Sequence, residues 1–293
     1  MNALLNSLAC AKLDLWRKGD SIHLSRHPSI QASKALALIL GILAIPGLHR
    51  AYGKTNDFSS CFISGEVSKY KVSWIGLPLA WSRTSIDTIT ENGRELIRFR
   101  MVVENYKAYS YIYKVDDVTE VVIDPKTALP LRLDVILNEG SIQKSHLTTF
   151  YHDQGVAVFQ DRISKDIREV PIESGTRDIY SFLYSARNRD LATLASQEHT
   201  LFVDGKLYEL GLKIRKERKI KLPGYGKVEC DQIEPIAEFD GIFLRKGKIM
   251  FWVSKQNRRM VTCIKAKVAV GKITVKLQEV SGPGDDFWIN KKK

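Results

Sequence analysis

Hydrophobic and polar side chains alternate in short runs along most of the chain from Phe62 onward. The clearest run extends from Arg94 to Val103, where every second residue is apolar and Arg98 and Arg100 lie between them. Successive side chains of a β-strand point to opposite faces, so the apolar residues share one face. They are Ile97, Phe99, Met101 and Val103. This run therefore predicts a half-buried strand.

The preceding run, Thr84 to Glu91, ends at Asn92-Gly93. That dipeptide readily adopts the two positive φ angles of a type I′ turn, so we predict a β-hairpin there. Similar turn residues recur between later segments rich in Val, Ile, Tyr, Phe and Thr, at Glu139-Gly140, Gln154-Gly155, Asp204-Gly205, Gly224-Tyr225-Gly226, Asp240-Gly241 and Lys246-Gly247. Many strands with short connections predict an antiparallel sheet.

One segment, near residues 178–188, departs from the alternation. Its apolar residues follow the i, i+3, i+4, i+7 spacing of an amphipathic helix. They are Ile179, Phe182, Leu183 and Ala186. Asp178 or Thr176 would cap the helix at its N-terminus, because a side-chain oxygen there can accept from the first free amides.

These elements predict a mainly β fold. No Pro- or Ser-rich linker divides residues 54–293, so we predict a single β domain; two subdomains hinged near the helix are the alternative. A single short helix cannot cover the apolar face of a long sheet. We therefore expect a curved antiparallel sheet that forms a barrel or half-barrel, with one short amphipathic helix near residues 178–188.

An uncharged apolar segment, residues 35–48, precedes the predicted domain. It is shorter than the roughly 20 residues that span a bilayer, and it resembles the h-region of a signal peptide. Ala51 and Gly53 provide the small residues that suit cleavage after Gly53. Residues 1–53 are thus predicted as an N-terminal extension with a signal segment, an uncleaved anchor being the alternative. Either alternative predicts an exported protein, in the periplasm or associated with a membrane.

The chain carries 45 Lys and Arg against 33 Asp and Glu, a formal net charge of +12. The densest basic run extends from Lys213 to Lys221. On a strand, four of its cations would point to one side and form a strip that attracts phosphates. They are Lys213, Arg215, Lys219 and Lys221. In an exported protein we expect those phosphates on lipids rather than nucleic acid; a charged edge strand that resists aggregation is the alternative.

Tyrosines concentrate just after the predicted hairpin. Tyr106 is followed by three more that would share one strand face: Tyr109, Tyr111 and Tyr113. Such a face is typical of a core or barrel lining, and it can also contact an apolar ligand.

The sequence contains none of the common catalytic motifs, such as a nucleophile elbow, a phosphate loop or a His-Glu-x-x-His helix. His146 and His152 are expected to be exposed near a hairpin end; a metal or acid–base site is the alternative, although a metal would need a further ligand. The acidic pairs Asp116-Asp117 and Asp285-Asp286 are expected to be solvated turn residues. We expect no cofactor and no metal.

Three cysteines fall within the predicted domain: Cys61, Cys230 and Cys263. We expect buried free thiols. The alternative is a Cys230–Cys263 disulfide across neighbouring strands, which an oxidising envelope would permit.

Several sequence segments together resemble the domain-of-unknown-function family 3108 (DUF3108) of exported bacterial proteins. They are Tyr70 to Gly76, Asp124 to Arg132, Asp178 to Arg187, and Phe251 to Val261 followed by Gly271. The resemblance covers about residues 66–277 and implies an exported, mostly β protein with no established activity. At the level of the fold, the chain is also similar to half-barrel lipoprotein carriers and sensors of the periplasm.

Within the segment Asp178 to Arg187, the candidate ligand-binding residues are Tyr180, Tyr184 and Arg187, which would lie along one edge of the helix. They either face a ligand on the concave side of the sheet, or Asp178 caps the helix and Arg187 forms a buried ion pair with the sheet. The leading hypothesis is a non-enzymatic envelope protein that binds a lipid-like or other hydrophobic ligand on a concave β surface. The alternatives are a hydrolase acting on a cell-envelope substrate and a structural or assembly protein that docks a partner along an edge strand.

Overall fold

The computed structural model describes residues 57–109, 114–239, 242–243, 249–268 and 271–290. Within them, 16 strands form one sheet in which neighbouring strands are antiparallel. The first half comprises β1 (Val67–Trp74), β2 (Leu77–Glu91), β3 (Arg94–Asn105), β4 (Asp116–Asp124), β5 (Leu129–Glu139), β6 (Ile142–Tyr151), β7 (Val156–Asp161) and β8 (Ile167–Pro171). The second half comprises β9 (His199–Val203), β10 (Lys206–Ile214), β11 (Arg218–Leu222), β12 (Gly226–Phe239), β13 (Ile242–Phe243), β14 (Ile249–Ser254), β15 (Val261–Lys267) and β16 (Lys272–Ser281).

The predicted hairpin is confirmed. Strands β2 and β3 are joined by Asn92 and Gly93, whose φ angles of 50° and 74° are those of a type I′ turn. In β3 the four predicted apolar residues are all buried, while Arg100 is exposed. Positive φ angles also occur at Gly140, Gly155 and Gly205. The predicted turns at Asp240-Gly241 and Lys246-Gly247 lie outside the described residues.

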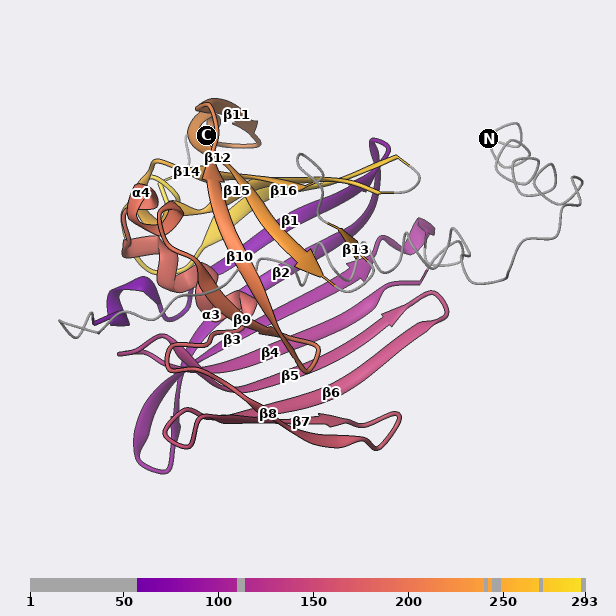
Figure 1. Ribbon diagram of the computed structural model, residues 1–293. Coiled ribbons are helices and arrows are strands. Elements are labelled where there is room, and N and C mark those ends of the chain that lie inside the picture. Colours follow the sequence, from indigo (N-terminus) through magenta and orange to yellow (C-terminus); the bar gives the residue numbers. More distant parts are fainter. Residues whose placement is uncertain (1–56, 110–113, 240–241, 244–248, 269–270, 291–293) are drawn as a thin grey trace, which may run out of the picture.

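The sheet is strongly curved but not closed. Its strand order runs β8-β7-β6-β5-β4-β3-β2-β1-β16-β15-β14-β12-β10-β9, with β11 and β13 pairing to β12. Figure 1 shows β10 and β12 crossing over the face of the β2–β6 region. Ring centroids of Phe150 on β6 and Phe202 on β9 are 5.3 Å apart, so the two ends of the sheet meet through side chains. The sheet is therefore an open half-barrel, one of the two predicted forms.

The predicted helix is also confirmed, as α3 (Ile179–Ser185), continued by the 3-10 turn η4 (Ala186–Asn188). It is less amphipathic than expected, since only Leu183 of its seven residues is not fully buried. A second short helix, α4 (Leu191–Ala195), follows. Its five residues are too few to show a helical period, which is why the sequence pattern did not predict it.

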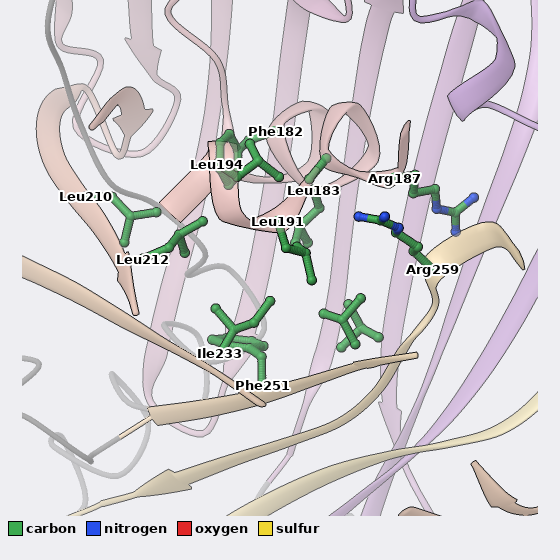
Figure 2. A pocket seen from close by; sticks show the side chains of 13 residues that line it. Phe182, Leu183, Arg187, Leu191, Leu194, Leu210, Leu212, Ile233, Phe251 and Arg259 are labelled. Atoms are coloured by element: carbon green, nitrogen blue, oxygen red, sulfur yellow. The ribbon is translucent and has the colours of Figure 1, made fainter. Parts of the chain in front are cut away.

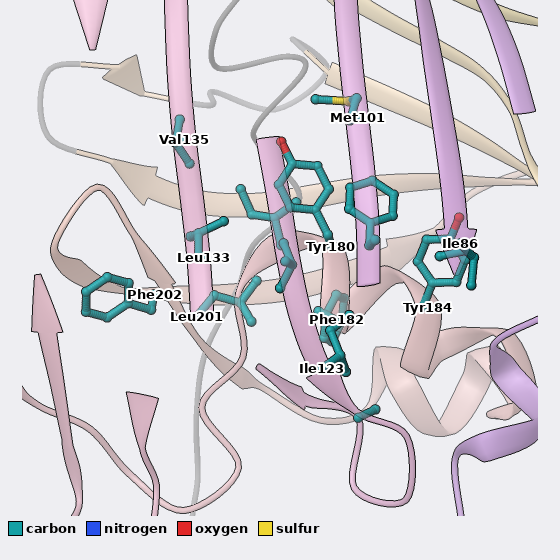
Figure 3. Close-up of a cluster of buried hydrophobic side chains, with 14 of the residues drawn as sticks. Ile86, Met101, Ile123, Leu133, Val135, Tyr180, Phe182, Tyr184, Leu201 and Phe202 are labelled. Carbon is teal, nitrogen blue, oxygen red and sulfur yellow. The ribbon is translucent and has the colours of Figure 1, made fainter. Parts of the chain in front are cut away.

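Two hydrophobic cores lie on the sheet. The larger fills the concave side around α3, where Tyr180 and Tyr184 pack among strand residues (Figure 3). The smaller includes Trp252 of β14 and Trp288, which is fully buried near the end of the chain. Because Phe251 belongs to the larger core and Trp252 to the smaller, β14 is covered on both faces.

The predicted tyrosine face and the predicted signal segment are not seen in the described residues. Tyr109 lies in the 3-10 turn η3 (Lys107–Tyr109), so it does not share a strand face as predicted. Tyr111, Tyr113 and the predicted signal or anchor segment within residues 1–53 lie outside the described residues. Within the described part of the chain, no helix is both long and apolar enough to cross a membrane.

Candidate functional site

An apolar cavity of about 60 Å³ lies between the helices and the second half of the sheet, and we call it the helix pocket. Figure 2 shows its lining side chains converging from α3, α4 and the facing strands. The lining residues are Phe182, Leu183, Ala186, Arg187, Leu191, Leu194, Leu210, Leu212, Ile233, Phe251, Val253, Arg259 and Val261. All but the two arginines are hydrophobic.

Strand alternation and helix capping place these side chains. Leu210 and Leu212 of β10 are two residues apart, as are Phe251 and Val253 of β14, so each pair points to the same side. The helices are anchored at their starts: the Asp178 carboxylate accepts from the Tyr180 amide at 2.7 Å, and Asp190 accepts from the Thr193 amide at 2.8 Å. Both aspartates act as N-caps, which the sequence predicted only for α3.

The helix pocket reaches the surface. Leu183, Leu191 and Leu212 are only half-buried, as are Val253 and Val261. Apolar side chains that line a concave site and are partly open to water are typical of a site for a hydrophobic group.

The two arginines at one end of the helix pocket have different partners. The Arg187 guanidinium donates to both Glu66 carboxylate oxygens, at 2.7 and 3.1 Å, and lies 4.1 Å from the Tyr184 ring centroid. Arg259 donates to the Arg189 carbonyl at 2.6 Å. Among the described residues, no carboxylate lies within ion-pair distance of Arg259. Its charge is therefore available to an anionic group at the pocket.

Glu66 is the centre of a buried ionic network. It is 1% exposed and also accepts from Arg258 at 3.3 Å. Arg258 in turn pairs with Asp286 and donates to the Pro283 carbonyl. The network ties the start of β1, the end of α3 and the chain after β16 together. Buried charges need such pairing, since an uncompensated one would be strongly destabilising.

The predicted helix residues thus divide between two roles. Asp178 caps α3 and Arg187 forms a buried ion pair. This is the structural alternative predicted for these two residues. Tyr180 and Tyr184 do not line the helix pocket but pack against Phe99 of β3, with ring centroids 4.8 and 5.6 Å away. Burial raises the pKa of both phenols well above the ordinary value.

The prediction of a basic strip on one face is wrong. Lys213 lies opposite Glu234 on β12, whereas Lys219 lies opposite Glu229. These two glutamates are five residues apart on one regular strand, so they point to opposite faces. The chain between β10 and β11 contains one extra residue relative to the facing part of β12. The side chains of Lys219 and Lys221 therefore point to the opposite face of the sheet from that of Lys213.

Pairing also reduces the free charge of the basic run. Arg215 donates to Glu234 at 2.6 Å, and Lys219 pairs with Glu229 at 2.9 Å. Lys213 and Lys221 stay exposed. The run therefore fits the alternative prediction, charged residues on an edge strand, better than a single phosphate-binding surface.

The two histidines lie apart from the helix pocket. His146 is buried on β6, contrary to expectation, with Nε2 3.2 Å from the Asp204 carboxylate. His152 follows β6 in a turn and contacts the Pro130 carbonyl at 2.8 Å. No cluster of three or more metal-ligating side chains occurs among the described residues.

The remaining candidate groups have structural positions. Asp117 is buried at the start of β4 and is not a solvated turn acid; its neighbour Asp116 is exposed. The three described cysteines are buried and free, as predicted. Cys230 and Cys263 lie on β12 and β15, with β14 between them, so a bridge across neighbouring strands is ruled out.

Most of the helix pocket is not predictable from the sequence. The alternating pairs on β10 and β14 could be read from the sequence, but not their position opposite α4. Arg259 lies in a turn where it adopts a φ of 39°, and nothing in its local sequence indicates that it lines a cavity. These residues meet only through the long-range curvature of the sheet.

Comparisons with known proteins agree with this architecture. A crystal structure of a β-barrel-like protein of domain-of-unknown-function family DUF1849 from Brucella abortus has a similar fold, with a TM-score of 0.50 and 10% sequence identity. The similarity covers 76% of this chain and 99% of the other. No curated protein matches the sequence. The model of the family described as "Protein of unknown function (DUF3108)" matches residues 69–278. This chain therefore belongs to the DUF3108 family.

Proposed function

We propose that this protein is a non-enzymatic binder of an amphiphile, which places an apolar chain in the helix pocket and an anionic end near Arg259. The observation that carries the proposal is the combination of a solvent-reaching, apolar lining with an arginine that has no carboxylate partner in the described part of the chain. An apolar chain gains free energy in proportion to the area that it removes from water, and an arginine fits a carboxylate or phosphate.

The size of the helix pocket bears on how such a ligand would bind. About 60 Å³ is far below the roughly 300–1,000 Å³ of typical ligand sites, so it accommodates only the end of an acyl chain. A longer chain requires α4 to move away from β10. This five-residue helix contributes Leu191 and Leu194 and is the shorter of the two α-helices in the lining, which makes it the natural moving part.

The proposal also includes export of the protein to the cell envelope. An exported protein would meet acyl chains and anionic headgroups in the envelope, and residues 35–48 support export because they resemble a signal h-region. N-terminal sequencing of the native protein tests this. A mature chain that begins near Lys54 supports a cleaved signal, an intact membrane-held chain supports an anchor, and a cytoplasmic chain that retains Met1 contradicts export.

Binding can be tested with a fluorescent fatty acid and its methyl ester. We expect Leu191→Asp to abolish binding of both probes, because it places a charge in the apolar lining. Ala192→Asp is the matched control, since Ala192 is exposed on the same helix and does not line the pocket. Arg259→Gln should weaken the acid by roughly ten-fold and leave the ester unchanged.

Thermal melting of each variant verifies the fold. If the wild-type protein binds neither probe, or if both helix variants lose binding equally, the helix pocket is not the ligand site. Mass spectrometry of envelope-purified protein provides an independent check, because it should reveal co-purifying amphiphiles.

A further inference from the structure

The turn between β1 and β2 has an unusual composition for a surface turn. Ile75 is 58% exposed and adopts a φ of 50°, followed by Gly76 at 87°. These are the angles of a type I′ turn, whose first position favours Asn, Asp or Gly. A β-branched residue is an outlier there, and this one also exposes an apolar side chain to water. Neither property benefits the isolated domain.

Further apolar side chains surround Ile75. Leu77 is 44% exposed and lies opposite Trp74 in the hairpin. Tyr106 is 36% exposed, and its amide donates to the Leu79 carbonyl at 3.0 Å, which brings it beside the same strand. We call Trp74, Ile75, Leu77 and Tyr106 the apolar rim.

The apolar rim is braced by Gly271 and Lys272 at the start of β16. The Ile75 amide donates to the Lys272 carbonyl at 2.9 Å. A Cβ at Gly271 would lie only 2.5 Å from Ile75 Cγ1, so the isoleucine packs directly on that glycine. Figure 1 shows the β1–β2 turn beside the adjoining ends of β15 and β16 at the upper right, away from α3 and α4. The tip is therefore held in place as a rigid projection.

Two lysines lie level with Ile75, beside this projection. Lys267 and Lys272 are exposed and directly opposite each other in the β15–β16 pair. Among the described residues neither forms an ion pair, and like charges in facing positions destabilise a sheet. Like the exposed isoleucine, this arrangement costs stability in the free domain and becomes favourable beside an anionic surface.

We propose that the apolar rim docks onto an anionic lipid bilayer. Ile75 and Leu77 enter the boundary of the acyl chains, and Trp74 and Tyr106 lie at headgroup depth, where amphipathic aromatic rings concentrate in membrane proteins. Lys267 and Lys272 contact lipid phosphates. This inference does not rest on the proposed ligand, because the helix pocket lies near the Glu66 end of β1 and the apolar rim lies at its Trp74 end.

The test uses protein purified from the envelope in its native processed form, with vesicles of phosphatidylcholine alone or with about a third phosphatidylglycerol. We expect binding to the anionic vesicles, weakened by salt. Ile75→Asn should reduce binding at least about ten-fold, because it removes the most exposed side chain of the apolar rim. Asn also suits the φ of this position, so the variant should melt no lower than the wild type.

Two further variants sharpen the result. Ile167→Asn is the matched control, since Ile167 is 64% exposed on β8, far along the sheet, and should leave binding unchanged. Lys267→Gln with Lys272→Gln should remove most of the preference for anionic vesicles. The proposal is overturned if Ile75→Asn binds like the wild type, if Ile167→Asn weakens vesicle binding as much as Ile75→Asn does, or if the apolar rim mediates self-association without vesicle binding.

Discussion

Asp117 shows how a single residue can respond to pH in this fold. Its carboxylate accepts from the Asn138 amide at 2.8 Å, and Glu139 lies buried beside it. Burial raises the pKa of Asp117 to about 6, well above the ordinary value for an aspartate. The folded state therefore binds a proton more readily than the unfolded state, and the contribution of this group to stability declines as pH rises from about 4 to 6.

We expect Asp117→Asn to stabilise the protein above pH 6, by about 1–3 kcal/mol, because it removes a buried charge and keeps an acceptor for the Asn138 amide. The gain should shrink as the pH falls toward 4, where the wild-type carboxyl is protonated in the folded state. Urea unfolding at several pH values measures it. Asp116→Asn is the control, because Asp116 is exposed, and it should change stability little at any of these pH values. An equal effect of both variants would contradict the argument.

At the scale of elements, hairpin chemistry follows from local sequence. Gly93 has a φ of 74°, and no heavy atom lies within 4 Å of the place that an added Cβ would occupy, so a substitution there meets only backbone strain. Gly211 on β10 has an ordinary φ, and the nearest atom to an added Cβ is 4.0 Å away. An added Cβ clashes at neither position, so the two glycines differ in backbone strain alone.

We expect Gly93→Ala to reduce the free energy of unfolding by about 1 kcal/mol, since an L-residue is disfavoured at that φ. Gly211→Ala should be neutral or slightly stabilising, because it reduces the freedom of the unfolded chain. Chemical denaturation of both variants tests this. If Gly93→Ala is as stable as the wild type, the turn does not depend on glycine.

The elements also show how far sequence patterns extend. Alternation predicted β3, and the Asn92-Gly93 turn predicted its hairpin, because both depend on neighbouring residues. The reversal of sides between Lys213 and Lys219 was not predictable, because it arises from pairing with β12. Asp117 and His146 were misjudged for the same reason: their burial comes from elements distant in sequence that cover them.

At the scale of the whole molecule, the half-barrel is fastened by contacts between its two ends. Asp204, in the turn between β9 and β10, pairs with Lys144 and lies 3.2 Å from His146, both on β6. Burial alone would raise the pKa of Asp204, but the hydrogen bonds and charges of His146 and Lys144 outweigh it and lower that pKa below its ordinary value. The ionised carboxylate therefore stabilises this closure above the ordinary pKa, and the contribution is lost as pH falls below it.

Asp204→Asn should consequently loosen β9 and β10 at neutral pH, with a loss of about 1 kcal/mol, because the ion pair is partly exposed. Hydrogen exchange should accelerate at the amides of these two strands. Asp134→Asn is the matched control: it breaks a similarly exposed pair with Arg162 that lies within one half of the sheet. Faster exchange in β9 and β10 of the control would show that general destabilisation is responsible.

The curved antiparallel architecture was predictable from the need to hide an apolar face, and the family resemblance agreed with it. The helix pocket was not, because its lining comes from α3, α4 and four strands that are brought together by the order of the sheet. Local periodicity identifies which residues are buried. It does not specify which buried residues face each other.

The pairing of β1 with β16 has a consequence for the time course of folding. This ladder runs from Val67 opposite Ser281 to Trp74 opposite Ile273, so it joins the first and last strands of the described sheet. Strands β1 to β8 pair with successive neighbours and can assemble before the last strand of the sheet is in place. One edge of β1, however, stays unpaired until β16 emerges. During that interval the folding protein exposes a free strand edge around Val72 that invites aggregation.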